Sequence, residues 1–417
     1  MDLISRIRVW EKSEADAIPL ALVLLVSPLM PLVTLRHLKG LREYEYLPDP
    51  EEMLSGNPGF RHLSDKMREV LQTALLAQRA GKRSVLEQKL EELLGKTASE
   101  LEVSSYHITQ LFQFSSLFIT VIPVTVVSVV FFISLSLVTN LLLACALIAV
   151  VAGGLLGFGV FPRELALPAP PIKSFIAAAP IPLVYLILYM LGRLGVGVEC
   201  PALLSVAAGS VLLSALQLVW RRRVLSAYRE ARELVRRAGV ASYNVFAALG
   251  VVEPEYLLSD KWVGVARAAT TSLYMLCLFG GRGLEAALRR LETYVGRYLD
   301  YLLRVRGRMR AMFIYGLIET LVVACTYAIL VATLQFFGTM PWSAAATGMR
   351  MPTQAELAEL LCWLDLVLAV DSVALALATA AAREGQPLLF GIYLPPLSGA
   401  MWLGYVLGLR LAPLLFT

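Results

Sequence analysis

Sixty consecutive residues of this chain, 103–162, contain no Asp, Glu, Lys or Arg. Such a stretch has room for two bilayer-crossing helices, because one crossing takes about 20 predominantly apolar residues. The whole chain agrees: 58% of its residues are hydrophobic and only 17% are charged, whereas soluble domains are about 45–50% apolar and about 25% charged. We therefore expect an integral membrane protein.

Further apolar windows complete the expected set of spans. The long window should hold two spans that turn near Asn140, and the whole set comprises residues 115–138, 141–160, 174–194, 200–220, 311–337, 358–382 and about 387–409. An earlier run, Ile18–Leu35, contains three prolines, which break hydrogen bonds inside a helix. It could span the membrane or form a re-entrant or interfacial anchor. The total is then seven or eight transmembrane helices.

Two polar segments interrupt the apolar windows. Residues 36–110 carry 11 basic and 12 acidic side chains, and residues 221–310 carry 17 basic and 8 acidic ones, a net charge of +9. Four expected spans separate the segments, so both should lie on one side, and the positive-inside rule makes that side cytoplasmic. Neither shows the alternation of a strand. The chain is expected to be an all-α protein of the cell membrane, with most of its polar mass in the cytoplasm.

This pattern predicts five regions. They are an N-terminal anchor over 1–35, a cytoplasmic helical bundle over 36–110, four transmembrane helices over 111–220, a basic cytoplasmic bundle over 221–310 and three transmembrane helices over 311–417.

The second polar segment ends in a regular helical stripe. Steps of three and four separate its apolar residues, Leu284, Leu288, Leu291, Val295, Tyr298, Leu302 and Val305, which is the spacing of one buried helix face. Arg289, Arg290 and Arg297 lie off the stripe. They are expected either to dock an acidic partner through their positive field or to form a solvated face that follows the positive-inside rule.

Three glycines, Gly280, Gly281 and Gly283, precede the stripe. Glycine permits positive φ and close helix approach, so a tight turn between helices is expected. A phosphate-binding loop would need a strand before it and a Walker lysine after it, and neither is present. Gly95-Lys96-Thr97 lacks the earlier glycine of that motif, which argues against nucleotide binding there.

The two polar segments align when the chain is shifted by 198 residues. Leu86 then falls on Leu284, Leu90 on Leu288, and the span 115–138 on residues 313–336. Each half would be a helical bundle that leads into a transmembrane helix, which indicates an internal duplication.

The second copy carries a sequence resemblance. Its GGRGLEAAL motif over Gly280–Leu288, followed by Leu291 and a span about 25 residues later, resembles the F-domain of the inner-membrane platform proteins of type II secretion, type IV pilus and archaellum machines. The resemblance covers roughly residues 66–337 and is nearest to the archaeal or Tad-type variant. The first copy lacks the Gly-Leu pair.

The resemblance implies a scaffold that is not an enzyme and holds no cofactor. Such a platform contacts a cytoplasmic hexameric ATPase and transmits its movements to pilin-like subunits drawn from the lipid bilayer. We expect a homo-oligomer, with a dimer as one form. The chain's own residues predict no metal or catalytic site and no nucleic-acid partner, because its three histidines are scattered, its five cysteines lack metal-ligand spacing and it has no basic tail.

Three acidic residues, Glu319, Asp365 and Asp371, lie inside expected spans. A charge at mid-bilayer costs at least about 2.5–3.5 kcal/mol, so such residues are functional candidates. The other interpretation is that they are buried and bonded to Ser, Thr or Tyr side chains of neighbouring helices. Asp365 and Asp371 lie about 240° apart around a helix and cannot share one narrow face. The intramembrane acids and the internal repeat make a secondary transporter the alternative function. A membrane enzyme is disfavoured, because no nucleophile elbow and no carboxylate pair on a water-side face is found in the sequence.

Overall fold

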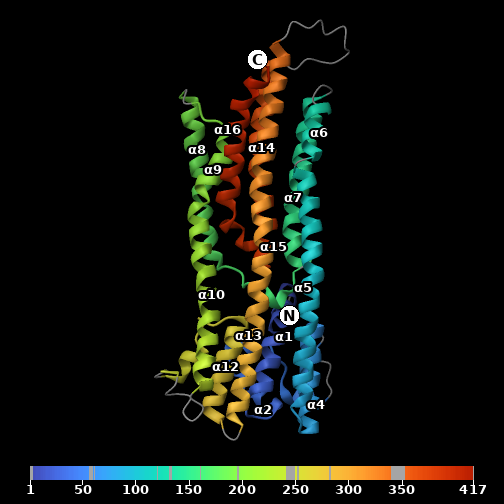
Figure 1. The fold of residues 1–417 in the computed structure, drawn as a ribbon, viewed down its shortest axis with the longest axis vertical. Helices are drawn as coiled ribbons and strands as arrows, with labels where there is room; N and C mark the ends of the chain where they lie inside the picture. Colours follow the sequence, from blue (N-terminus) through green and yellow to red (C-terminus); the bar gives the residue numbers. More distant parts are fainter. Residues whose placement is uncertain are drawn as a thin grey trace. The chain divides into compact units, whose positions relative to one another are not determined.

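The computed structural model is all-helical over the residues it describes (Figure 1). These are residues 3–55, 60, 62–119, 121–130, 134–159, 161–194, 197–240, 249–250, 253–280, 283–339 and 353–416. No strand occurs among them. The expected fold class is confirmed to that extent.

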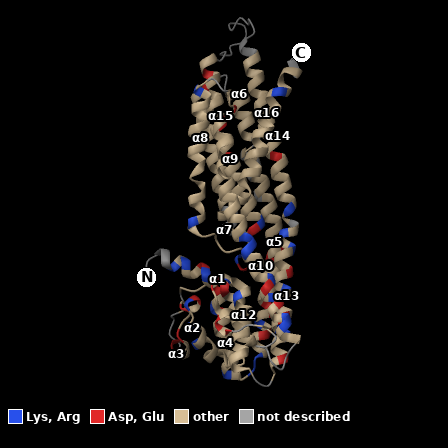
Figure 2. Ribbon diagram, turned by 90° about the vertical axis from the view of Figure 1, so that its left-hand side faces the viewer, with Lys and Arg blue, Asp and Glu red and all other residues tan. Residues whose placement is uncertain are grey.

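The chain divides into two compact units. Unit 1 comprises Met1–Val103, Pro162–Pro168 and Arg221–Val305, and unit 2 comprises Ser104–Phe161, Ala169–Trp220 and Arg306–Thr417. Both polar segments, expected as two bundles, fall in unit 1 together with the N-terminal run. Lys, Arg, Asp and Glu gather on the helices of unit 1, while those of unit 2 are almost free of them (Figure 2). The cytoplasmic location of unit 1 stays a prediction.

Two sets of helices build the units. Unit 1 holds α1 (Leu3–Val26), α2 (Pro31–Lys39), η1 (Arg42–Tyr44), α3 (Pro50–Leu54), α4 (Asp65–Ala80), η2 (Arg163–Leu165), η4 (Pro254–Leu258), α12 (Gly264–Phe279) and most of α13 (Leu284–Arg308). Unit 2 holds α6 (Val121–Val130), α7 (Leu135–Gly159), η3 (Ile172–Ala178), α8 (Pro180–Arg193), α9 (Pro201–Gly209), α14 (Arg310–Thr339), α15 (Gln354–Glu384), η6 (Pro387–Ile392) and α16 (Leu394–Phe416). Both units share α5 (Ser84–Ile119) and α10 (Val211–Val240).

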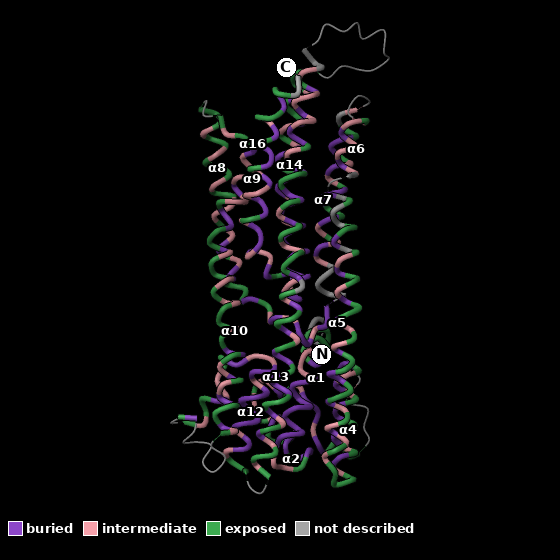
Figure 3. The backbone as a smooth tube through the Cα atoms, in the orientation of Figure 1, coloured by how far each residue is buried: buried purple, intermediate pink, exposed green. Residues whose placement is uncertain are grey.

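The apolar run Ile18–Leu35 lies in the core of unit 1. Its first part belongs to α1, which is buried on every face over residues 17–26 (Figure 3) and packs against α4 and α12. Its second part belongs to α2, and residues 27–30 separate the two helices. Arg83 stabilises that break by donating hydrogen bonds to the carbonyls of Pro28 (2.9 Å) and Leu29 (3.1 Å). The run is hydrophobic all round because it is a core helix, and neither α1 nor α2 is among the described helices that are both long and apolar enough to cross a membrane.

Six helical segments among the described residues are long and apolar enough to cross a membrane. They are Ser136–Gly154, Ile172–Arg193, Pro201–Val240, Leu284–Phe336, Gln354–Glu384 and Leu394–Leu414. A multi-pass membrane protein is therefore confirmed, while the expected count of seven or eight spans is not.

The expected span 115–138 does not form one helix. It is distributed over α5, α6 and α7. Asn140, expected at a turn, lies inside α7, so that prediction is wrong. The apolar residues on both sides of Asn140 continue the helix, and one asparagine costs a helix interior less than about 0.7 kcal/mol relative to alanine.

Small residues let the helices of unit 2 approach closely. A Cβ atom added to Gly153 of α7 would lie 2.7 Å from the carbonyl oxygen of Ala374 in α15. One added to Gly408 of α16 would lie 2.6 Å from the carbonyl oxygen of Cys325 in α14. Side chains at these positions would force the backbones apart, as in other small-residue contacts between membrane helices.

Candidate functional site

The turn between α12 and α13 depends on glycine. Gly283 has a φ of +94°, a region that residues with a Cβ atom rarely adopt. Gly280 ends α12, and a Cβ atom there would collide with the carbonyl oxygen of Leu276. Gly281 lies outside the described residues. Glycine is therefore required at the two positions for different reasons. Gly280 has no space for a Cβ atom, whereas Gly283 has a backbone conformation that other residues rarely adopt.

The helical stripe predicted after this turn is buried as expected. Leu288, Leu291, Val295, Tyr298, Leu302 and Val305 are each at most 3% exposed, and Leu284 is half-buried. The long apolar side chains on one face therefore hold α13 in unit 1, and its arginines lie on the other faces.

The three candidate docking arginines all have partners within the chain. Arg289 pairs with Glu285 one turn earlier in α13 (2.5 Å). Arg290 pairs with Glu87 (3.3 Å) and Arg297 with Glu91 (2.9 Å), both on α5. These pairs are half-exposed, so each contributes on the order of 0–1 kcal/mol. Two of the three arginines thus connect the stripe helix to its counterpart in the first polar segment.

The two regions related by the 198-residue shift form similar hairpins. α4 and α12 each contain 16 residues, and their starts differ by 199 positions. A glycine with positive φ follows each helix, Gly81 (+61°) in the first copy and Gly283 (+94°) in the second. The next helix then begins, at Ser84 and at Leu284. The equal helix lengths are compatible with the predicted duplication, but Gly283 lies 202 positions after Gly81 and is therefore not equivalent to it under the 198-residue shift.

A half-buried lysine connects four elements of unit 1. Lys66 of α4 pairs with Glu164 of η2 (2.5 Å), Glu100 of α5 (3.1 Å) and Glu14 of α1 (3.3 Å). Burial alone would lower the pKa of Lys66, but hydrogen bonds and charges from these carboxylates outweigh it and raise the pKa. The hydroxyl of Tyr298 also donates to the Glu164 carbonyl. These contacts hold the segment 162–168 in unit 1.

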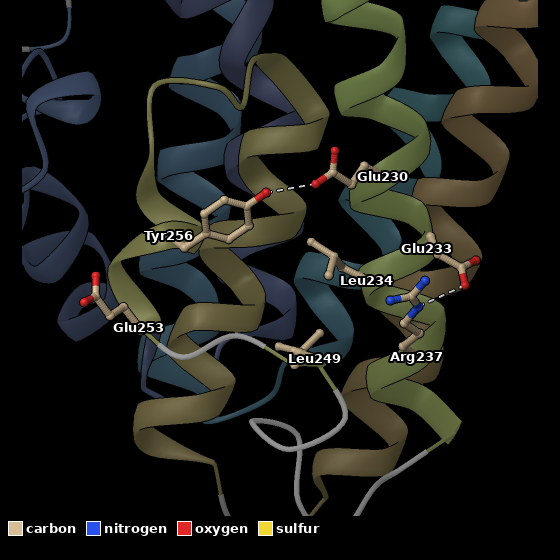
Figure 4. Close-up of a pocket in the computed structure, with 8 residues that line it drawn as sticks. Glu230, Glu233, Leu234, Arg237, Leu249, Glu253 and Tyr256 are labelled. Carbon is tan, nitrogen blue, oxygen red and sulfur yellow. Dashed lines mark hydrogen bonds and ion pairs between the residues drawn. The ribbon is translucent and has the colours of Figure 1, made fainter.

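Unit 1 also contains a cavity of about 600 Å³ beside α10 and η4 (Figure 4). Two of the carboxylates that line it, Glu230 and Glu233, are engaged within the protein. Glu230 accepts a hydrogen bond from the Tyr256 hydroxyl (2.9 Å) and pairs with Lys261 (2.6 Å), while Glu233 pairs with Arg237 (3.1 Å). Small-molecule sites are mostly apolar with a few convergent polar groups, so this ionic lining does not favour one.

Asp365 stabilises the start of another helix. Its Oδ2 accepts a hydrogen bond from the backbone N–H of Ala202 (2.7 Å), and its Oδ1 accepts one from the N–H of Leu203 (2.9 Å). Those amides are in the first turn of α9, where backbone donors lack partners within the helix and a negative charge is favourable. Asp365 is thus bonded to a neighbouring helix, but through backbone amides and not through the Ser, Thr or Tyr side chains that were expected.

Replacing Asp365 with alanine should therefore destabilise unit 2 by about 1–2 kcal/mol, the usual cost of losing an N-terminal cap. Asparagine retains one acceptor oxygen and should recover part of the loss. Denaturation of the purified protein in detergent measures the effect, with Glu359→Ala on an exposed face of the same helix as the control. Equal stability of Asp365→Ala and Glu359→Ala would contradict the capping role.

Glu319 and Asp371 are buried in unit 2, 8% and 1% exposed. They belong to α14 and α15, and their carboxyl groups are close enough to interact electrostatically. The structure therefore separates Asp371 from Asp365, which is bonded to α9, and associates it with Glu319. The sequence could not reveal this pairing, because the two residues lie 52 positions apart.

A second buried ionic contact lies at the last turn of α15. Arg306, 10% exposed, pairs with the fully buried Glu384 (3.1 Å), and Tyr393 donates a hydrogen bond to the same carboxylate (2.7 Å). An acidic side chain at the end of another helix therefore covers Arg306, which is the reason why this arginine is not solvated.

The described residues contain no group of three or more His, Cys, Asp or Glu residues arranged to hold a metal ion. All five cysteines are free thiols. Gly95-Lys96-Thr97 lies within α5, where the amides of an α-helix bond to carbonyls four residues earlier and cannot surround a phosphate.

Compared with known proteins, the chain matches no protein-family model, no curated protein and no solved structure.

Proposed function

We propose that this protein is a membrane platform that couples a cytoplasmic hexameric ATPase to the assembly of pilin-like subunits into a filament or secretion machine. The observation that carries the proposal is the pair of helix–turn–helix segments, α4–α5 and α12–α13, each with a 16-residue first helix and a glycine of positive φ before the second helix. It supports the duplicated bundle-plus-span organisation to which the sequence resemblance points.

Helical continuity along the chain supports the same function. α5 belongs to unit 1 up to Val103 and to unit 2 from Ser104. One residue separates α13 from α14, and α10 also contributes to both units. Helices that continue from unit 1 into membrane-spanning segments are compatible with a protein that transmits a motor's movement.

The three arginines of α13 provide the test of the docking surface. Replacing Arg289, Arg290 and Arg297 with glutamate should weaken co-purification with a secretion-type ATPase at least about tenfold, which corresponds to about 1.4 kcal/mol. The control is the double variant Arg236→Glu and Arg237→Glu, which reverses charges on an exposed part of α10. It should leave binding to the ATPase unchanged.

A compensating variant separates docking from folding. Adding Glu87→Arg and Glu91→Arg to the triple variant restores the two ion pairs between α5 and α13 with the charges exchanged. If binding returns, the arginines act through the α5–α13 contact and the docking surface lies elsewhere. Unchanged binding in the triple variant would also reject the docking surface, whereas failure of the unmodified protein to bind any such ATPase would count against the platform itself.

A secondary transporter is the alternative function. The buried carboxyl groups of Glu319 and Asp371 favour it, because intramembrane acids often bind transported ions or protons. The helix break between α9 and α10 is a second feature of transporters, whose sites use discontinuous helices. Ion-coupled solute uptake into proteoliposomes that contain only this protein would support the alternative over the platform.

A further inference from the structure

Asp371 occupies an unusual position in unit 2. It lies 17 residues after the start of α15 and 13 before its end, so it is near the middle of an expected span. It is 1% exposed, and neither of its carboxyl oxygens has a hydrogen-bond partner among the described residues. No Lys, Arg or His side chain in the described part of the chain pairs with it either. A negative charge on Asp371 would therefore be uncompensated.

The groups around Asp371 come from two neighbouring helices. From α14, Glu319 and Tyr327 lie within electrostatic range, and from α7, Cys145 does. The Tyr327 hydroxyl is also buried without a hydrogen-bond partner among the described residues. None of these groups is a cation, and ionised Glu319 would carry a charge of the same sign.

Other titratable groups on the elements that pack against α15 face different residues. Cys200, at the start of α9, and Tyr405 of α16 interact with Asp365. The Arg306–Glu384 pair lies 13 residues along α15, about 20 Å at 1.5 Å per residue. Asp371 thus has no counter-charge within a direct contact distance.

Two ways of neutralising Asp371 make different demands on the site. A metal cation needs a shell of several oxygens, six to eight in the case of Ca²⁺, whereas the carboxyl and hydroxyl groups that the described residues bring near Asp371 are its own two oxygens, the Glu319 carboxyl and the Tyr327 hydroxyl. A proton needs one oxygen. It also removes the cost of an unpaired charge in a water-free interior, at least about 2.5 kcal/mol, and supplies an O–H donor.

We propose that Asp371 is a proton-binding site inside the membrane unit, and that release of its proton requires the contact between α7 and α15 to open. Asp371 is 1% exposed, and Gly153 of α7 approaches Ala374 closely one turn further along α15. A deprotonated Asp371 would need water or a cation beside it, and the tight contact between the two helices would have to open to admit either. Proton occupancy and helix packing are thereby linked, whether the protein is a platform or a transporter.

Infrared spectroscopy of the full-length protein in lipid nanodiscs tests the proposal. At neutral pH the unmodified protein should show the carbonyl band of a neutral carboxyl group, and Asp371→Asn should lose it. Asp365→Asn is the matched control on the same helix and should retain the band, because it leaves Asp371 unchanged and removes a carboxyl group whose two oxygens already accept amide hydrogen bonds. A band that persists in Asp371→Asn, or that disappears only in Asp365→Asn, would overturn the proposal.

Chemical labelling gives a second measurement that needs no substitution. Dicyclohexylcarbodiimide modifies neutral carboxyl groups in apolar surroundings, so mass spectrometry should find an adduct on Asp371 and none on Asp365. Absence of the Asp371 adduct would overturn the proposal even if Asp371→Asn did not fold. So would stoichiometric proton release when sodium chloride is added to the unmodified protein, because a metal cation would then occupy the site.

Discussion

Replacing Arg306 with alanine is expected to lower the free energy of unfolding of unit 2 by about 3–5 kcal/mol, because removing one partner of a buried ion pair leaves the other charge uncompensated. The partner, Glu384, is fully buried and accepts a hydrogen bond from Tyr393. One neutral hydroxyl cannot replace the lost positive charge. The change should therefore exceed the effect of an ordinary surface substitution several-fold.

Denaturation of the purified protein in detergent, followed by tryptophan fluorescence, measures this loss. Arg304→Ala is the matched control, since Arg304 lies two residues earlier on an exposed face. We expect it to change stability by no more than about 0.5 kcal/mol. Replacing Arg306 and Glu384 together by methionine and leucine should recover most of the loss, because an apolar pair has no charge to desolvate. If Arg306→Ala costs no more than Arg304→Ala, the buried pair does not stabilise the unit.

The second large effect is expected at Lys66. Lys66→Met should destabilise unit 1 by about 3–5 kcal/mol, because three carboxylates would then face one another without a cation. One of them, Glu164, has a side chain only 1% exposed. The lost contacts also connect α4 to α1, α5 and η2, so the segment 162–168 should become the first part of unit 1 to exchange its amide hydrogens.

Lys89→Met is the matched control for Lys66→Met. Both lysine side chains are 14% exposed and both pair with glutamates, but the partners of Lys89, Glu69 and Glu92, are 49% and 64% exposed. Water can solvate those carboxylates once the lysine is gone, so a loss of at most about 1 kcal/mol is expected. Equal losses of stability in the two variants would show that the burial of Glu164 does not determine how much Lys66→Met lowers the free energy of unfolding.

The pH dependence gives Lys66 a second signature. Its pKa in the folded protein is raised, and the ordinary lysine pKa is about 10.4. The folded state therefore binds this proton more tightly than the unfolded state, so the Lys66 contribution is fully present below about pH 10 and is lost as the pH rises through the folded pKa. The stability difference between the unmodified protein and Lys66→Met should stay constant from neutral pH to about pH 9.5 and shrink above it.

The intramembrane acids show how far sequence reasoning reached. Hydropathy identified all three as charges within apolar segments, and helical geometry separated Asp365 from Asp371. It could not assign their partners. Asp365 is bonded to the first turn of α9, which lies more than 160 positions away, whereas Asp371 lies near Glu319 of α14. Those partners depend on which helices become neighbours, and local periodicity contains no information on that.

The N-terminal run Ile18–Leu35 shows a second limit of sequence reasoning, which concerns apolar residues instead of charges. Its length and apolarity were compatible with a membrane span, and its prolines with an anchor. The structure makes it a core helix of unit 1, because α4 and α12 cover it on both sides. A sequence cannot distinguish a helix that is apolar because lipid surrounds it from one that other helices surround, since both bury every face.

The sequence by itself determined the properties that depend on local composition and period. These are the helical fold class, the membrane-spanning character, the buried stripe of α13 and the spacing of two similar segments. Only the tertiary structure decided which charges are satisfied and by what. Arg290 and Arg297 face α5 rather than solvent alone, Arg306 is covered by Glu384, and Asp371 has no cation beside it among the residues that the structure describes. The reason is physical: apolar burial follows the helical period, whereas the energy of a charge depends on whichever group, however distant in the chain, lies within a few ångströms of it.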